Sequence, residues 1–359
     1  MGDERDIAFS PISAPDEPTR LAAEARYEEL ATPSGSLGRL ETLGAWIAAC
    51  QGRCPPRSPR RPRLVLFAGD HGVAARGVSA YPAEATGQMV ANVLAGNAAV
   101  NVLAEAAGVT IRVVDMAVDG AVSAPEEVTA YKARSGCEPI DRADALTDEQ
   151  VRAAVAAGRD IADREVDAGA DLLVPGDIGV GNSTPAAVLI AALTGSEPVA
   201  VVGRGSGIDD AGWMRKVVVI RDGLRRASRV ASDPVALLRT SAGADIAAMT
   251  AFLAQAAVRK TPVVLDGVVS AAAALVAEEL APGARRWWVA GHRCAEPAHE
   301  LALGHLGLAP LVDLTMRLGS GCGGVAAVPL LDMAARVLAD TATFAEAGIT
   351  GPTVPVRDR

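Results

Sequence analysis

Short, largely apolar runs recur along the middle of the chain, each followed by a Gly- or Asp-rich turn and then an Ala-rich stretch. The runs are Leu64–Ala68, Ile111–Ala117, Leu172–Pro175, Val199–Val202, Val263–Leu265 and Trp287–Ala290. Apolar runs without strict alternation are typical of strands buried on both faces of a parallel sheet. Because such strands alternate here with helical stretches, the pattern predicts a doubly wound α/β domain.

Both ends of the chain have helical patterns instead. Residues 21–50 show helical periodicity with an interruption at Pro33–Ser36. Residues 325–348 are again helical, and Gly348 is suited to the left-handed position that follows a last helical turn. These stretches predict helices outside the sheet-containing region.

Two segments predict irregular structure. Residues 1–20 are polar and proline-rich, and residues 51–62 contain four prolines. Proline stops a helix and removes a backbone donor, so we interpret residues 51–62 as a linker. A chain of 359 residues that is 50% hydrophobic is long enough for one large domain, or one large and one small.

The net charge and the aromatic content limit which kinds of ligand are expected. The formal net charge is −9, and aromatic residues make up only 3% of the chain. An acidic surface repels phosphate backbones, and few aromatic rings are present for stacking, so nucleic acid is not an expected partner. A small anionic substrate stays compatible with this charge, because backbone N–H groups can bind a phosphate locally.

The five cysteines lack the spacing of a disulfide framework, and we expect reduced thiols in a cytoplasmic protein. Cys50 and Cys54 have no second pair, so two ordinary thiols are favoured over a zinc site. Residues 1–6 have no basic segment followed by an apolar one, so no signal peptide is expected. The apolar runs are interrupted by Gly, Asp or Arg, and no membrane span is expected.

Polar or glycine-rich turns follow most of the predicted strands. They are Gly69–Gly72, Gly176–Asn182, Gly203–Gly207, Asp266–Gly267 and Gly291–His292. Any one of them is explained by the need for a tight turn. In a doubly wound domain, however, ligands bind beyond the carboxyl ends of the strands, so five such turns together favour a binding site at that edge.

The segment Gly176–Thr184 is the strongest phosphate-binding candidate. Gly179 and Gly181 allow an oxyanion to approach the backbone, while Ser183 and Thr184 can cap a helix predicted over Ala186–Leu193. No Gly-Lys-Ser/Thr follows, as a Walker A loop requires, and the third glycine of a dinucleotide fingerprint is missing. The pattern predicts the phosphate of a mononucleotide and disfavours a dinucleotide-dependent dehydrogenase.

Three further residues have a functional and an ordinary interpretation. Arg204 can bind phosphate or ribose, or can be a structural arginine. His71, beside Asp70, can perform acid–base work or stabilise a turn. Lys216 precedes the apolar run Val217–Ile220 and can face the site from the start of a strand, although a single lysine is usually solvated. The histidines lack metal-ligand spacing, and no Gly-x-Ser-x-Gly elbow occurs.

A series of motifs follows in a fixed order between about residues 20 and 350. They are Pro33–Glu41, Phe67–Val73, Gly77–Pro82 with Thr86, Gln88 and Met89, Gly176–Thr184, Val202–Gly212 with Lys216, Leu265–Gly267, Ala295–Pro297, Leu318–Gly319 and Ala342–Gly348. Each motif is weak alone, but the ordered set is specific. It resembles the nicotinate mononucleotide:dimethylbenzimidazole phosphoribosyltransferases of cobamide synthesis.

The resemblance implies a Rossmann-like domain over residues 61–324 and a small helical domain from residues 1–60 and 325–359. It also implies a homodimer, no metal and no organic cofactor. The implied reaction moves phosphoribose from nicotinate mononucleotide to dimethylbenzimidazole or a related heterocycle, giving an α-ribotide and nicotinate.

The resemblance also assigns residues to the two substrates. The phosphate and ribose are expected at Gly179, Val180, Gly181, Asn182, Ser183, Thr184, Gly203, Arg204, His292 and Gly319. The acceptor base is expected at Ser79, Tyr81, Gln88 and Leu318. Ser320, Asp177 and Lys216 fall at the expected catalytic positions.

The sequence departs from the family pattern at several of these positions. The family motif Arg-Leu-Gly-Glu-Gly-Thr-Gly corresponds to Arg317–Gly323 here, which places Ser320 where the family has its catalytic glutamate. Asp177 replaces a longer glutamate, Gly291-His292 replaces Ser-His, and Ala244-Asp245 replaces Phe-Glu. These changes concern the acceptor side more than the phosphate side.

Three hypotheses follow from these departures. The first keeps the family reaction, with Asp177 or solvent taking the proton that a glutamate takes elsewhere, because a neutral serine hydroxyl is too weak a base to take up a proton near neutral pH. The second keeps phosphoribosyl transfer but changes the acceptor to another azole, a purine or a phenol. The third is a non-catalytic protein that binds a nucleotide or an α-ribazole-like ligand.

Overall fold

A computed structural model describes residues 7–120 and 122–352 of the chain. The chain forms two compact units. The larger contains Arg61–Ala327 and the N-terminal segment up to Ile12, and the smaller contains Ser13–Arg60 and the C-terminal segment from Val328. The domain limits given above stay a prediction, and residues 1–6, where no signal peptide is expected, lie outside the described residues.

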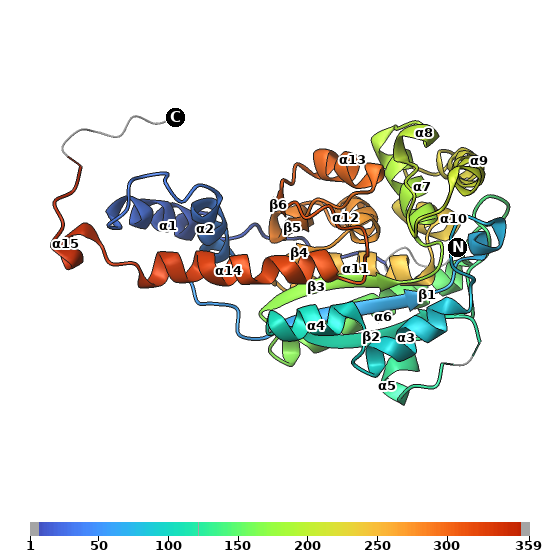
Figure 1. The fold of residues 1–359 in the computed structure, drawn as a ribbon, viewed down its shortest axis with the longest axis horizontal. Helices are drawn as coiled ribbons and strands as arrows, with labels where there is room; N and C mark the ends of the chain where they lie inside the picture. The colour runs from blue at the N-terminus through green and yellow to red at the C-terminus, as the bar shows by residue number, and fades with distance from the viewer. Residues whose placement is uncertain (1–6, 121, 353–359) are drawn as a thin grey trace. The chain divides into compact units, whose positions relative to one another are not determined.

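The larger unit is built on a six-stranded sheet in the order β2-β1-β3-β4-β5-β6, in which every pair is parallel (Figure 1). The strands are β1 (Pro62–Gly69), β2 (Thr110–Ala117), β3 (Leu172–Ile178), β4 (Val263–Leu265), β5 (Trp288–His292) and β6 (Pro310–Val312). This architecture confirms the predicted α/β class.

The strand order reverses at β1, which pairs with β2 on one side and β3 on the other. Such a reversal is where doubly wound sheets open a crevice for ligands. In register, Phe67 of β1 lies beside Asp177 of β3. A Cβ atom at Gly179 would lie 2.3 Å from the carbonyl oxygen of Gly69, so only glycine lets these two strand ends approach so closely.

Helices connect the strands and pack around the sheet (Figure 1). They are α3 (Ala85–Leu94), α4 (Ala99–Ala106), α5 (Glu126–Thr129), α6 (Asp148–Asp167), α7 (Ser183–Thr194), α8 (Pro198–Val201), α9 (Asp210–Ala227), α10 (Pro234–Ser241), α11 (Ala244–Val258), α12 (Val268–Leu280) and α13 (Pro297–Leu306), with 3₁₀ turns at Gly72–Arg76 and Ala284–Trp287. Close packing of α6 on α11 depends on Gly158, where a Cβ atom would lie 2.0 Å from the Ala248 carbonyl oxygen. The predicted helix over Ala186–Leu193 is confirmed as part of α7.

The strand predicted at Val199–Val202 is wrong, because this run forms most of the short helix α8. Pro198 occupies the first turn of α8, where its fixed φ and missing N–H are tolerated. Val199 is 62% exposed, which a central strand would not allow. The sixth strand is instead β6, a short run with intermediate burial at the sheet edge that the apolar pattern did not reveal.

The strand start predicted at Lys216 is also wrong, because Lys216 lies inside helix α9. Asp209 caps this helix through a hydrogen bond from the Gly212 N–H, at 2.7 Å. Within the run Val217–Ile220, Val218 is 43% exposed while the last two residues are buried. Four consecutive residues turn almost once around a helix, so such a short apolar run shows no helical periodicity and cannot be distinguished from a strand by its pattern.

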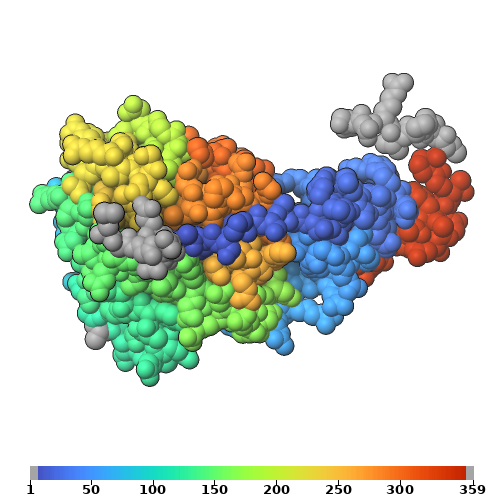
Figure 2. Space-filling model, turned by 180° about the vertical axis from the view of Figure 1, so that it is seen from behind, coloured from blue at the N-terminus to red at the C-terminus, as the bar shows by residue number. Residues whose placement is uncertain are grey.

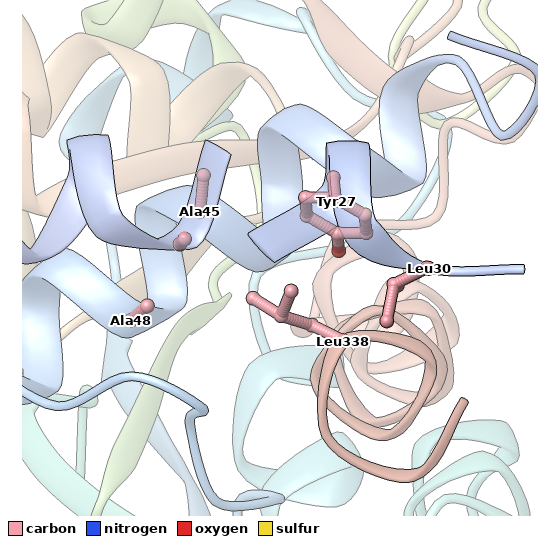
Figure 3. Close-up of a cluster of buried hydrophobic side chains, with 6 residues drawn as sticks. Tyr27, Leu30, Ala45, Ala48 and Leu338 are labelled. Atoms are coloured by element: carbon pink, nitrogen blue, oxygen red, sulfur yellow. The ribbon is translucent and has the colours of Figure 1, made fainter. Parts of the chain in front are cut away.

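The smaller unit is helical. It contains α1 (Glu17–Glu29), α2 (Arg39–Gln51), most of α14 (Cys322–Asp340) and α15 (Phe344–Ala347). Its core consists of Ala23, Tyr27, Leu30, Ala45, Ala48 and Leu338, most of which Figure 3 labels. The break predicted at Pro33–Ser36 separates α1 from α2, and the helix predicted over 325–348 is interrupted before a capping box at Thr343.

The segment that follows residue 6 is held on the larger unit by Arg159, and Figure 2 shows it in dark blue on the molecular surface. The guanidinium donates to the carbonyl oxygens of Ile7 and Ala8 and lies 4.0 Å from the centre of the Phe9 ring. This stretch of the predicted loose lead-in is therefore anchored by specific contacts.

Two helical stretches, Ala85–Ala106 and Cys322–Asp340, are long and apolar enough to cross a membrane by length and composition. The first is divided into α3 and α4. In the second, 56% of the apolar window is buried within the protein, as in the core helix of a soluble protein. The expectation of no membrane span stays a prediction.

Candidate active site

A cavity of about 540 Å³ opens beyond the carboxyl end of β3. The residues that line it are Val78, Ser79, Tyr81, Met89, Asp177–Ser183, Gly205, Ser206, Gly267–Val269, Cys294, Glu296 and Met316–Ser320. Most residues predicted for the phosphate turn, the acceptor and the catalytic position therefore share one cavity. Thr184, Gln88, Gly203, Arg204, Lys216 and His292 were also predicted for the site, but they do not line it.

The turn between β3 and α7 is fixed to the end of β1 by a chain of hydrogen bonds. The Val180 N–H donates to Thr86 Oγ1 at 3.0 Å, and the Thr86 hydroxyl donates to Asp70 Oδ1 at 2.5 Å. Asp70 Oδ2 accepts the Asp119 N–H at 2.8 Å. Gly181 adopts a φ of 83°, which favours glycine. The turn is thus set in place before any ligand binds.

The start of α7 presents unpaired donors to the cavity. Within the described part of the chain, the backbone N–H groups of Gly181 and Ser183 have no hydrogen-bond partner. Free N–H groups at the N-terminus of a helix, together with the helix dipole, attract an anion. The geometry at Gly181–Ser183 is therefore that of a phosphate-binding turn.

Lys216 lies directly behind this turn. Its side chain is only 1% exposed, and Nζ donates to Ser183 Oγ at 2.9 Å. Among the described residues it forms no ion pair within 4.0 Å. Burial lowers the pKa of Lys216, and the nearby Glu296 carboxylate opposes that shift. A buried cation without a paired anion is costly, so a bound phosphate close to Ser183 would stabilise it.

The turn over 203–207 forms a second wall of the cavity. Glu296 lies against it, because Oε1 accepts the Gly205 N–H at 2.8 Å and a Cβ atom at Gly203 would lie 1.9 Å from Oε2. Glu296 is 6% exposed and lines the cavity, although the sequence analysis assigned it no role. Arg204 instead pairs with the carboxylate of Asp210 and donates to the Ile208 carbonyl oxygen, outside the cavity.

Three of the four proposed acceptor residues, Ser79, Tyr81 and Leu318, line the cavity and form its acceptor rim, whereas Gln88 does not line it. Ser79 Oγ lies 3.1 Å from Ser206 Oγ, which also accepts the Ala80 N–H at 2.9 Å. Tyr81 is 53% exposed and Leu318 is 64% exposed, so both present apolar surface at the opening. These hydroxyl contacts join the acceptor rim to the turn over 203–207.

The loop that carries Ser320 crosses over β3. Gly319, Ser320 and Gly321 all have positive φ, at 76°, 57° and 77°. A Cβ atom at Gly176 would lie 2.7 Å from the Gly321 nitrogen, and one at Gly319 would lie 3.1 Å from Asp177 Oδ2. The backbone of this loop therefore lies against β3, and Ser320 lines the same cavity as Asp177.

Asp177 is almost fully buried at the floor of the cavity. Its Oδ2 accepts a hydrogen bond from Asn182 Nδ2 at 2.7 Å. Burial, followed by the negative charge of Asp266, raises the pKa of Asp177 to about 7, although the Asn182 bond opposes the shift. A carboxyl group with this pKa can gain or lose a proton near neutral pH, which is the property of a general acid or base.

A buried His71–Asp245 pair lies outside the cavity lining, with Nε2 and Oδ2 separated by 3.1 Å. Burial lowers the pKa of His71, but the carboxylates of Asp245, Asp70 and Asp177 together outweigh this and leave the pKa above its ordinary value. His292 is likewise buried, with Nε2 at 3.7 Å from Asp266 Oδ1. Both histidines therefore lie behind the cavity surface.

No group of three or more His, Cys, Asp or Glu side chains in residues 7–120 and 122–352 is arranged to hold a metal ion. All five cysteines are free thiols, and Cys50 and Cys54 form neither a disulfide nor such a cluster.

Comparisons with known proteins agree with this geometry. A phosphoribosyltransferase family model matches residues 12–349. The nicotinate-nucleotide–dimethylbenzimidazole phosphoribosyltransferase of Mycobacterium ulcerans (strain Agy99) is 61% identical over 344 residues, 96% of each chain. The protein of that name from Mycobacterium tuberculosis (strain H37Rv) is 58% identical over 353 residues, 98% of each chain.

Solved structures extend the match to the fold. The enzyme of that name from Thermus thermophilus superimposes with a TM-score of 0.88 at 40% identity, covering 94% of this chain and 100% of its own. A structure of CobT from the same organism gives a TM-score of 0.88 at 41% identity, covering 93% of this chain and 99% of its own. The chain belongs to the nicotinate-nucleotide–dimethylbenzimidazole phosphoribosyltransferase family.

Proposed function

We propose that this protein is a pentosyltransferase that moves phosphoribose from nicotinate mononucleotide to dimethylbenzimidazole or a related heterocycle. The observation that carries the proposal is the phosphate-binding geometry, in which the free N–H groups of Gly181 and Ser183 lie close to the buried Lys216. The identities of the donor and the acceptor are inferred from the names of its relatives.

The reaction suits a site that supplies position and charge. The glycosidic bond from ribose C1′ to the pyridinium nitrogen breaks, and nicotinate leaves with the electron pair. An acceptor nitrogen forms the new bond to C1′ with its lone pair, and the ring N–H of the acceptor then loses its proton. A turn that fixes the phosphate holds C1′ in place for this attack, which lowers the entropic part of the barrier.

We further propose that this chain is a divergent member that lacks the family's catalytic glutamate, with Ser320 at that position. A serine hydroxyl can orient the acceptor base but is too weak a base to take up the proton that the acceptor ring loses. Asp177, which lines the same cavity and has its pKa raised to about 7, is the proposed proton acceptor. It is ionised, and therefore able to act as a base, above neutral pH.

The proposal is tested by incubating the purified protein with nicotinate mononucleotide and dimethylbenzimidazole and measuring nicotinate and ribotide by chromatography. Both products are expected in equal amounts. Ser320→Glu is expected to raise kcat by about tenfold. This is less than a general base usually contributes, because Asp177 already acts as the base in the wild type. Ser320→Ala is the matched control, with a change of about threefold or less.

A different acceptor is the second candidate, and the combination of Ser320 with an exposed rim at Tyr81 and Leu318 favours it. A panel of azoles, purines and phenols separates the possibilities. Nicotinate release with one of these and none with dimethylbenzimidazole selects the second candidate. Binding of nicotinate mononucleotide without release for any acceptor leaves only the ligand-binding protein.

We also propose a homodimer, as the family resemblance implies, and a location in the cytoplasm, as expected for a protein with reduced thiols. An apolar surface on α3 and α4 supports a dimer, with Met89, Leu94 and Val102 exposed by 37%, 39% and 64%. Sedimentation velocity is expected to show a dimer that Val102→Asp weakens. A wild-type protein that stays monomeric at low and at high concentration alike would contradict it.

A further inference from the structure

Asp266 is a buried carboxylate that follows β4 and is fully enclosed. Its Oδ1 accepts the N–H groups of Gly323 and Gly324 at 2.7 and 3.0 Å. Its Oδ2 accepts the N–H of Gly321 at 2.9 Å. One side chain thus binds three backbone donors of the segment that leads from the Ser320 loop into α14.

These bonds explain how the loop keeps an unusual conformation. Ser320 has a φ of 57°, a left-handed conformation that a residue with a Cβ atom rarely adopts without outside support, whereas its neighbours Gly319 and Gly321 adopt positive φ readily. The carboxylate supplies that support at the start of α14, where a negative charge is also favoured by the helix dipole. Three backbone N–H donors thus hold the Asp266 side chain in one place between β4 and the Ser320 loop.

We propose that Asp266 is a positioning residue for the acceptor step: it fixes the loop that carries Ser320 and places a second carboxylate within electrostatic reach of the proton acceptor Asp177. This inference rests on the proposed function of Asp177. Asp266 touches neither substrate in this account, because the cavity is lined by its neighbours Gly267 and Val268 rather than by Asp266 itself.

Several charged or titratable groups face Asp177 from the surrounding elements. They are His71 after β1, Asp245 on α11, Asp266 after β4 and Cys322 at the start of α14, while His292 contacts Asp266 from β5. After burial, Asp266 is the largest influence that raises the pKa of Asp177, and His71 acts in the opposite direction. Removing the charge of Asp266 is therefore expected to lower the pKa of Asp177.

The test is the pH dependence of kcat in the wild type and in Asp266→Asn. A base that must be ionised gives a rate that rises with pH through its pKa, near 7 in the wild type. In Asp266→Asn this rise is expected about one pH unit lower, with a reduced plateau because the loop loses bonds. Ser270→Ala is the matched control: it removes the hydrogen bond that the Asp266 N–H donates to Ser270 Oγ, at 2.9 Å, without changing a charge. In Ser270→Ala, kcat is expected to rise over the same pH range as in the wild type.

If the maximal kcat of Asp266→Asn is reduced but kcat rises over the same pH range as in the wild type, Asp266 has only a structural role and the proposal is overturned. If Asp266→Asn does not fold, carboxyl ¹³C titration of the wild type gives the answer, with Asp177→Asn used to assign its resonance. One carboxyl that is absent from Asp177→Asn is expected to titrate near pH 7; if no such carboxyl titrates near pH 7, the proposal is contradicted. This titration needs no turnover, so its failure is distinguishable from an absence of nicotinate release.

Discussion

The two sides of the cavity are built in different ways. The donor side presents backbone N–H groups of Gly181 and Ser183, backed by the buried Lys216. The acceptor side presents side chains from two loops, among them Tyr81, Leu318 and Ser320. Backbone groups persist through most substitutions, whereas a side chain changes with a single one. In the proposed function, the fold would therefore fix the donor, and a few side chains would select the acceptor.

The largest expected effect is the loss of Lys216 from the donor side. In Lys216→Met the apolar stem is kept but the charge that faces the phosphate is gone, a loss of about 4 kcal/mol. We expect kcat/KM for nicotinate mononucleotide to fall about 1,000-fold, while the KM for the acceptor changes little. Steady-state kinetics with each substrate varied in turn measures both.

Arg204→Ala is the control for this prediction, because Arg204 is paired with Asp210 and lies outside the cavity. A change of about threefold or less is expected. If Arg204→Ala proved as damaging as Lys216→Met, the donor side would extend to the outer face of the 203–207 turn.

The free energy of unfolding is expected to depend on pH because of Asp177, which lies at the floor of the cavity between the donor and acceptor sides. The pKa of Asp177 is raised from 3.8 to about 7 on folding, so the folded state binds the proton more tightly than the unfolded state. Its contribution is fully present below about pH 4 and is lost as the pH rises through 7. Between pH 5 and 8 the free energy of unfolding of the wild type should fall, relative to Asp177→Asn, by about 2–3 kcal/mol.

Urea denaturation of both proteins at pH 5 and pH 8 measures this difference. An equal gap between wild type and variant at the two pH values would mean that Asp177 has an ordinary pKa. It would then be ionised throughout and too weak a base for the role proposed here.

The smallest expected effect is on the acceptor rim. Leu318→Ala removes apolar surface from a side chain that is already 64% exposed, at a cost of about 1 kcal/mol. The KM for the acceptor should rise about fivefold, with the KM for nicotinate mononucleotide unchanged. Leu314→Ala is the matched control, because Leu314 is 58% exposed and does not line the cavity. Equal effects of the two variants would remove Leu318 from the acceptor site.

The sequence predicted the sheet and the phosphate turn for local reasons. Leu172–Pro175 is apolar and is followed at once by the glycines of the turn, so strand, turn and helix are visible within a few residues. The run at Val199–Val202 and the position of Lys216 were misinterpreted, because a run of only four apolar residues is too short for its periodicity to separate a helix from a strand.

Residues whose role depends on distant partners were harder to find. Glu296 binds Gly205, which is 91 positions away, and Asp266 binds Gly321, which is 55 positions away. The sequence analysis singled out both positions, within the turn Asp266–Gly267 and the motif Ala295–Pro297. It could not show which groups the two carboxylates bind. Lys216 was expected near the site, yet only the packing of α9 against α7 brings its ammonium group to Ser183.

The most direct test of the account is the KM for nicotinate mononucleotide measured against each member of a panel of azoles, purines and phenols. If the donor site is fixed by the backbone and the acceptor site by side chains, this KM stays within about threefold for every acceptor that reacts, while kcat/KM for the acceptors spans at least about 100-fold. A KM for nicotinate mononucleotide that changes with each acceptor as strongly as kcat/KM does would contradict it.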